Sequence, residues 1–168
     1  MALSISSSKA SSINFTLTQT NGNQSVSISD SASSAISYDY GSGVSQITNA
    51  SSIIGVLPSG GSTQIDLYAL PQPTFDAIQI VEFTGVKNFS VYNTSTTEGY
   101  DFTVASTGSN ACTNLFNGGS GNLLVKPYSG FTYNDPYDGF VVSTSQRYVY
   151  LDDLGSGVTY KIFVLGLD

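Results

Sequence analysis

The sequence predicts an all-β fold, an antiparallel β-sandwich of jelly-roll type with long glycine-rich loops. Aromatic residues make up 12% of the 168 residues and charged residues only 10%, while Ser, Thr, Asn and Gly are abundant. This composition favours strands and turns over helices, which usually carry Glu, Lys, Arg and Ala on their exposed faces. Short runs of alternating apolar residues recur, and turn-forming residues separate them about every 8–12 positions, a spacing typical of sandwiches.

The chain is expected to form one domain behind a flexible N-terminal arm. Residues 1–12 are rich in Ser and include Leu3 and Ile5, so we expect an arm that can order on a neighbouring chain. Residues 13–168 are long enough to bury one core without disulfides, and we assign them to a single β-sandwich domain.

A hairpin is predicted at the start of this domain. Residues 13–20 alternate between apolar and polar types, and the following Asn21-Gly22 is a pair favoured in two-residue hairpin loops. The partner strand is expected at 25–29. A polar loop at 30–34 and another strand at 35–40 follow.

The alternation weakens between residues 44 and 61. Here we expect an irregular crossing that still buries Ile53 and Val56. A regular strand is predicted again at 64–70, where prolines end it, because proline cannot donate to a strand ladder.

Residues 75–106 contain the clearest series of strands. Apolar residues alternate at 77–83, 86–92 and 100–105, and Gly, Asn, Ser and Thr residues separate the three runs. Each run offers one apolar face to a core. We therefore predict a three-stranded meander.

The C-terminal third is predicted to consist of short strands around one long loop at 107–121, which is rich in turn residues and of a length that is often functional. The last strand is apolar on both faces, with Phe163 and Leu165 on the second face. It is expected to be a central strand or to be covered by a neighbouring subunit. The strands are expected at 123–126, 131–133, 140–143, 146–151 and 159–165.

The charge balance argues against nucleic-acid and membrane partners. The chain has five Lys and Arg but twelve Asp and Glu, which gives a formal net charge of -7. Phosphate backbones and anionic lipid surfaces are bound through clustered Lys and Arg, whereas these cations are scattered singly. The N-terminus lacks the features of a signal peptide, so we expect synthesis in a host cytoplasm, and the single Cys112 excludes an intrachain disulfide.

The sequence offers little for catalysis, and we expect no enzymatic activity. It contains no His, which removes the usual general base near neutral pH and the Ser-His and Cys-His nucleophile pairs. Cys112 is expected to fill space as a neutral thiol. Paired carboxylates of glycosidase type remain an alternative, drawn from Asp135, Asp138, Asp152 and Asp153.

Calcium is the one cofactor that the sequence suggests. Asn134, Asp135 and Asp138 lie in a compact turn, and Ca²⁺ takes carboxylate, amide and backbone oxygens from such loops. Capping of the turn by these side chains is the alternative interpretation. We expect no other cofactor.

Several tyrosines are candidates for a binding surface, because tyrosine combines a large contact area with a polar tip. They could stack on sugars, form a protein interface, or pack at the rim of the core. They are Tyr128, Tyr133, Tyr137, Tyr148 and Tyr150.

Residues 64–168 resemble a known group of proteins. The segments that carry the resemblance are VKNFSVYNTSTTEGYDFTV, SNACTNLFNGGSGNLLVKPYSGF, NDPYDGFVVS and the closing GSGVTYKIFVLGLD. They resemble small virion proteins of tailed bacteriophages, of the decoration or minor structural type. The resemblance implies a β-sandwich attached to a capsid or tail, with no catalytic residues.

The expected function is therefore that of a structural virion protein, a decoration or cement protein that stabilises a phage head. Its partners would be the major capsid protein or other virion proteins, and it would form a homo-oligomer, most simply a homotrimer, located in the virion. A carbohydrate- or receptor-binding module of a fibre head or tail tip is the alternative. The residues expected at interfaces are Leu3, Ile5, Tyr148, Tyr150, Phe163 and Leu165.

Overall fold

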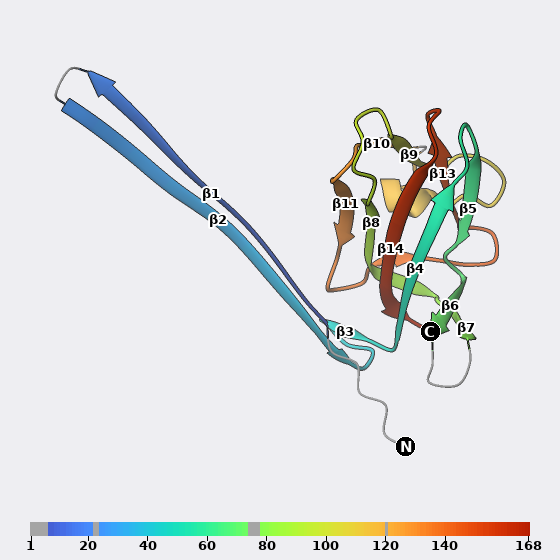
Figure 1. The fold of residues 1–168 in the computed structure, drawn as a ribbon. Coiled ribbons are helices and arrows are strands. Elements are labelled where there is room, and N and C mark those ends of the chain that lie inside the picture. Colours follow the sequence, from blue (N-terminus) through green and yellow to red (C-terminus); the bar gives the residue numbers. More distant parts are fainter. Residues whose placement is uncertain (1–6, 22–23, 74–77, 120) are drawn as a thin grey trace.

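The computed structural model describes residues 7–21, 24–73, 78–119 and 121–168. For the first strand and most of the second it describes the pairing of the backbone rather than the side chains. The fold is all-β, as predicted, and consists of a β-sandwich from which a long hairpin extends (Figure 1). The jelly-roll topology stays a prediction.

Two antiparallel sheets form the sandwich. The first has the strand order β10-β9-β13-β5, and the second has the order β11-β8-β14-β4, with β12 also paired to β8. The last strand, β14, therefore lies between two neighbours, which is the first of the two arrangements expected from its two apolar faces. The first sheet contains β5 (Ser62–Asp66), β9 (Phe102–Ala105), β10 (Asn122–Val125) and β13 (Tyr148–Asp153). The second contains β4 (Asn49–Leu57), β8 (Gly85–Asn93), β11 (Gly130–Asn134), β12 (Phe140–Val141) and β14 (Val158–Leu167).

The core lies between the inward faces of these sheets. Phe102 and Val104 of β9 pack in one cluster with Ile162 and Val164 of β14, and all four side chains are fully buried. Alternation along both strands predicted these faces correctly. Burial of each such side chain contributes about 1.5–3 kcal/mol, so the core stabilises the sandwich without a disulfide.

The predicted three-stranded meander is wrong, although its strands exist. β7 (Ile78–Glu82) pairs with β6 (Ala69–Pro73), whereas β8 and β9 belong to opposite sheets of the sandwich. Alternation determines which face of a strand is buried but not which strand lies beside it. The segment at 94–101 crosses from one sheet to the other instead of turning back within one sheet.

The irregular crossing predicted at 44–61 is also wrong, because β4 is a regular nine-residue strand. Ile53 is only partly buried against the core, and Val56 lies on the outward face with 68% of its surface exposed. The inward positions include Gly55, where a Cβ atom would lie 2.3 Å from the hydroxyl oxygen of Tyr160. The Tyr160 ring thus fills the space above Gly55, which has no side chain. Because glycine occupies one of the inward positions, the apolar residues of this segment did not reveal the alternation of the strand.

The hairpin predicted after residue 13 is present but longer than expected. β1 (Ser7–Asn21) pairs with β2 (Gln24–Tyr40) from Asn21 opposite Gln24 to Ser7 opposite Tyr38. Residues 7–12 are thus part of a strand, and the polar loop expected at 30–34 is wrong because β2 continues through it. Uninterrupted main-chain pairing overrides the weak strand preference of the Ser-rich sequence. Leu3 and Ile5 lie outside the described residues.

The long loop at 107–121 is fixed by apolar contacts. It contains a short 3-10 helix, η1 (Thr113–Phe116), in which Leu115 is buried. The Phe116 ring stacks on Phe131, with 6.3 Å between the ring centroids. Cys112, at the start of the helix, is fully buried.

Candidate functional site

The hairpin arm, defined here as strands β1 and β2, is the most distinctive feature of the molecule. Its fifteen-residue first strand spans about 50 Å at roughly 3.4 Å per residue. β2 continues at its lower end into a parallel pair with β3 (Gln46–Ile47). Beyond this pair, no described element lies along the arm, which extends away from the sandwich (Figure 1).

Tyr38 joins the arm to the sandwich. Its side chain is 2% exposed, its hydroxyl donates to Oδ1 of Asn134, and the same hydroxyl lies 3.3 Å from the carbonyl oxygen of Lys87. Burial raises the pKa of Tyr38 to about 12, and the nearby Asp135 and Tyr133 add to the shift. The hydroxyl therefore stays protonated and keeps its role as a donor.

Lys87 holds the segment that follows the arm. The pairing of β14 with β8 skips one residue here, since Leu165 lies opposite Asn88 and Gly166 opposite Val86. Lys87 is the extra residue of this bulge, and bulges redirect side chains. Its ammonium group is buried and donates to the carbonyl oxygen of Gly43 at 2.6 Å.

We call residues 38–47 and their partners the hairpin base. It also contains a hydrogen bond of 2.7 Å from the Ser45 N–H to the carbonyl oxygen of Pro136. Ile47 within it is fully buried. The arm is thus attached to the sandwich by a buried and hydrogen-bonded segment rather than by a bare linker.

The side chains proposed as calcium ligands take part in this base and its adjoining turn. Asn134 Oδ1 accepts from Tyr38, and Asp135 Oδ1 accepts from the Tyr137 N–H at 2.9 Å, the turn-capping alternative. Asp138 is exposed. Within the described residues, no group of three His, Cys, Asp or Glu side chains is arranged to hold a metal ion. A calcium site therefore stays a prediction.

The carboxylates considered for a glycosidase lie at two places: Asp135 and Asp138 in the turn after β11, and Asp152 and Asp153 at the end of β13. Asp153 Oδ2 accepts from the backbone N–H groups of Gly60, Gly155 and Gly157 at 2.6, 3.0 and 3.1 Å, whereas Asp135 caps the turn described above. Asp153 thus closes two loops at one end of the sandwich.

The four described residues among those expected at interfaces lie on the two outer faces of the sandwich. Tyr148 and Tyr150 alternate with the buried residues of β13 in one sheet, and Phe163 and Leu165 alternate with those of β14 in the other. The Arg147 guanidinium lies 5.2 Å from the Tyr148 ring centroid. Because the two pairs belong to opposite sheets, they cannot form one continuous patch.

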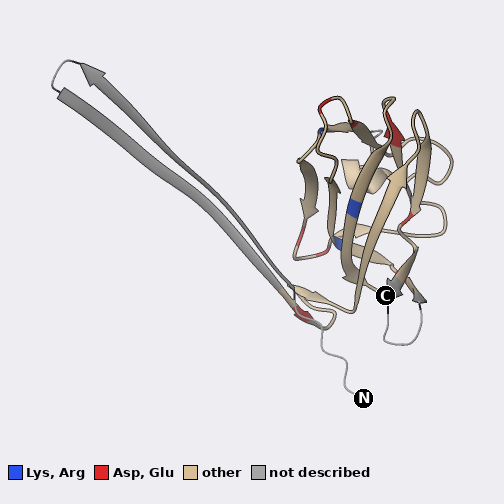
Figure 2. Cartoon of the chain, in the orientation of Figure 1, with Lys and Arg blue, Asp and Glu red and all other residues tan. Residues whose placement is uncertain are grey.

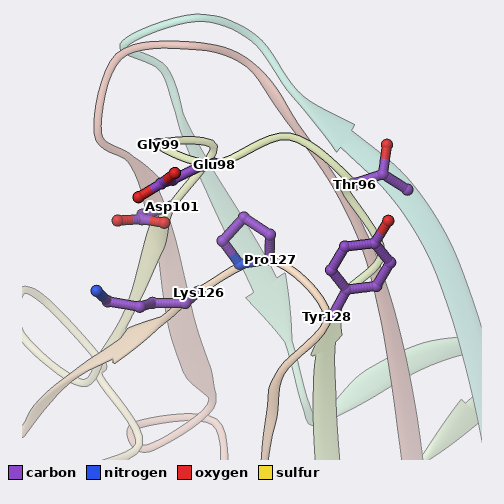
Figure 3. A pocket seen from close by; sticks show the side chains of 7 residues that line it. All are labelled: Thr96, Glu98, Gly99, Asp101, Lys126, Pro127 and Tyr128. Atoms are coloured by element: carbon purple, nitrogen blue, oxygen red, sulfur yellow. The ribbon is translucent and has the colours of Figure 1, made fainter.

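A pocket of about 430 Å³ lies at the turns 94–101 and 126–129, near the ends of β8, β9 and β10. The carboxylates of Glu98 and Asp101 and the ammonium group of Lys126 lie at one end, and the Tyr128 ring lies at the other (Figure 3). Thr96, Gly99 and Pro127 complete the lining. Of these residues, the sequence had indicated only Tyr128.

Tyr128 is held in an unusual conformation. Its φ of 58° lies in the left-handed region, and 76% of its surface is exposed. A large residue in that region costs about 1–3 kcal/mol unless its surroundings impose it. Here the turn is closed by Ser129, whose N–H and hydroxyl both donate to the carbonyl oxygen of Lys126 at 3.1 and 2.7 Å. The turn thus presents an aromatic ring to solvent beside the pocket.

Charged residues are sparse on the described part of the sandwich (Figure 2). Several cations are engaged within the protein: Lys87 is buried, Arg147 pairs with Asp66, and Lys161 lies 4.7 Å from the ring centroid of Phe163. Lys126, in contrast, is exposed at the pocket. The described surface therefore offers single cations rather than a basic patch.

Comparison of the chain with protein-family models, with curated proteins and with solved structures finds no match. In the part of the chain that the structure describes, no helix has the length and hydrophobicity needed to cross a membrane.

Proposed function

We propose that the chain is a structural virion protein, a capsid decoration or cement protein that attaches to a phage head through its hairpin arm. The major capsid protein or a neighbouring virion protein is its partner, and the chain acts as a symmetric homo-oligomer, a trimer. The resemblance of residues 64–168 to small phage virion proteins supports this class.

One observation carries the proposal: a hairpin arm about 50 Å long extends from the sandwich on a buried base. A two-stranded hairpin is marginally stable alone in water, and ordering each residue costs about 1–2 kcal/mol. The arm contains 32 residues, 15 in β1 and 17 in β2. Ordering so many residues is favourable chiefly when another surface covers the arm. Extended strands also offer main-chain groups to a neighbouring sheet edge.

The experiment is co-sedimentation of the purified chain with heads of the phage that encodes it, prepared without the chain. We expect saturable binding at a fixed ratio to the major capsid protein. Free sugars should not compete. Binding that fails to saturate, or no binding at all, would contradict the proposal.

The pocket favours a second candidate function, that of a carbohydrate-binding module. An exposed aromatic ring can stack on a sugar face, and Glu98, Asp101 and Lys126 can bind its hydroxyl groups. Glycan-array binding should then be lost in Tyr128→Ala. Tyr137→Ala is the matched control, because Tyr137 is also exposed, at 66%, but does not line the pocket. Equal binding by both variants would exclude this site.

A further inference from the structure

One buried side chain ties together the two turns that form the pocket. Asn93, at the end of β8, is 2% exposed, and its amide nitrogen donates to the carbonyl oxygens of Tyr100 and Val125 at 2.7 and 3.2 Å. These two residues directly precede Asp101 and Lys126, which line the pocket. Because a buried donor is costly to leave unpaired, the two turns keep this spacing. The pocket is therefore formed before a ligand binds.

One end of the pocket has an excess of negative charge. The carboxylates of Glu98 and Asp101 and the ammonium group of Lys126 lie at this end (Figure 3). The one ion pair within the described residues joins Arg147 to Asp66, so Lys126 is paired with neither carboxylate. One positive and two negative charges leave one negative charge in excess. A ligand group with a single positive charge balances this end of the pocket.

The other end of the pocket offers an apolar ring. The exposed Tyr128 ring lies there, and Pro127 lies between that ring and the charged groups (Figure 3). An aromatic ring can stack on the face of a sugar ring. The pocket volume of about 430 Å³ lies within the roughly 300–1,000 Å³ of small-ligand sites. The site thus fits a ligand that has a flat apolar ring face and a cation at one side of the ring.

We propose that the pocket binds an amino sugar, a pyranose that carries a protonated amine in place of one hydroxyl group. The amine pairs with Glu98 and Asp101, and the sugar ring stacks on Tyr128. Lys126 balances the charge of one carboxylate, so that one amine is sufficient. This inference goes beyond the proposed attachment role, and it rests on the second candidate function, whose ligand class it names.

The charges of the site favour this class over other sugars. An acidic sugar would place a third negative charge beside Glu98 and Asp101, on a chain whose formal net charge is already -7, and like charges repel. A neutral sugar binds carboxylates through its hydroxyl groups alone. A protonated amine forms such hydrogen bonds as well and adds the attraction between opposite charges.

The pocket and the hairpin base lie at opposite ends of the same two strands. β8 begins beside the base, where Lys87 contacts Gly43, and ends at Asn93, before the first turn of the pocket. β11 follows the second turn and ends at Asn134, which accepts from Tyr38. The distance from Lys87 to Asn93 along β8 is about 20 Å. Sugar binding and attachment through the arm therefore involve different residues and can be measured separately.

The first test uses three ligands that separate the amine from the sugar ring. They are the β-1,4-linked tetramer of glucosamine, the same tetramer with every amine acetylated, and spermine, which carries the same number of amines without a sugar ring. In nuclear magnetic resonance titrations at pH 6, where the amines are protonated, we expect the glucosamine tetramer to shift the amide signals of residues 96–101, 126 and 128. It should bind there at least about fivefold more tightly than either other ligand, because exposed ion pairs contribute modestly.

Each other result of these titrations would overturn the proposal. Equal or tighter binding of the acetylated tetramer would assign the pocket to neutral sugars. Equal or tighter binding of spermine at these residues would assign it to amines without a sugar. An absence of shifts with the glucosamine tetramer would refute the site itself.

The second test removes one charge at a time. Asp101→Asn and Glu98→Gln keep the side-chain shape, and each should weaken binding of the glucosamine tetramer about threefold to fivefold. Asp138→Asn is the matched control, because Asp138 is exposed but does not line the pocket. Tyr128→Phe, which keeps the ring, should bind as the wild type does, and Tyr128→Ala should not bind. Equal loss in Asp138→Asn and Asp101→Asn would reduce the effect to the net charge of the chain and overturn the proposal.

Head binding distinguishes this inference from the proposed function. A wild-type chain that binds the glucosamine tetramer at the pocket but does not bind phage heads would refute the attachment role alone. A wild-type chain that binds heads but not the tetramer would refute this inference alone.

Discussion

Removal of the Asp153 carboxylate should destabilise the sandwich substantially. This carboxylate accepts hydrogen bonds from Gly60, Gly155 and Gly157, and its residue is only 7% exposed. A hydrogen bond to a charged group contributes about 1.5–3 kcal/mol. Because the freed N–H groups lie in turns that water can partly reach, we expect Asp153→Ala to cost about 2–4 kcal/mol. For a chain of this length that lowers Tm by roughly 5–15 °C.

The assay is thermal unfolding followed by circular dichroism at pH 7. Asp152→Ala is the matched control, because Asp152 is the preceding residue of β13 but lies on its outer face; we expect a change within about 0.5 kcal/mol. Asp153→Asn, which keeps an acceptor oxygen but no charge, should fall between the two. If Asp153→Ala melted like Asp152→Ala, the argument that this carboxylate closes the loops would be refuted.

The same carboxylate should make stability depend on pH. Burial raises the pKa of Asp153, but hydrogen bonds from Gly157, Gly60, Gly155 and Ser156 outweigh burial, and the pKa lies below its ordinary value. The native state thus binds the proton less readily than the unfolded chain does. The stabilisation is present above the unfolded pKa of about 3.9 and is lost as pH falls through the lower native pKa. The Tm difference between wild type and Asp153→Asn should therefore shrink below about pH 4.

Three further outcomes are expected. Tyr38→Phe removes the donor at the hairpin base and should cost about 1 kcal/mol in a urea titration, whereas Tyr137→Phe, at an exposed site, should not change the midpoint. Burial raises the pKa of Cys112 to about 11 although backbone hydrogen bonds oppose the shift, so a thiol reagent at pH 8 should label the unfolded chain only, and labelling of the native chain would contradict the buried placement. If Asn134, Asp135 and Asp138 hold Ca²⁺, EDTA should lower Tm; an unchanged Tm would show that these side chains only cap the turn, through the hydrogen bonds that Asn134 and Asp135 accept.

The sequence predicted the fold class and most strands because these depend on local signals. In the C-terminal third, alternation identified β14 and its buried residues Ile162 and Val164, and turn residues separated the strands there correctly. The hairpin was located to within one residue from Asn21-Gly22, where the loop chemistry is specific, although Asn21 itself is the last residue of β1 and pairs with Gln24. Such features can be predicted from a few neighbouring residues.

Strand partners and the arm's length could not be predicted, because they depend on residues far apart in the chain. β7 pairs with β6, β8 pairs with β11, β12 and β14, and β9 pairs with β10 and β13. Nothing in the alternation of the three strands specifies these partners. The Ser-rich halves of the hairpin have no strong strand preference, so their pairing becomes visible only in the register. Likewise, Glu98, Asp101 and Lys126 lie at one pocket because two separate turns meet there. In the sequence, each of these residues looks like an ordinary surface residue.

The central claim, that the arm attaches this protein to a virion, is tested most directly with a shortened arm. Replacement of residues 12–33 by Asn-Gly keeps the pairs from Ser7–Tyr38 to Ser11–Ser34 and the hairpin base, so the sandwich should melt as in the wild type. Co-sedimentation with phage heads should then show saturable binding of the wild type and of the pocket variant Tyr128→Ala, and at least a tenfold loss for the shortened chain. Undiminished binding of the shortened chain, with loss in Tyr128→Ala, would contradict the account and assign attachment to the pocket.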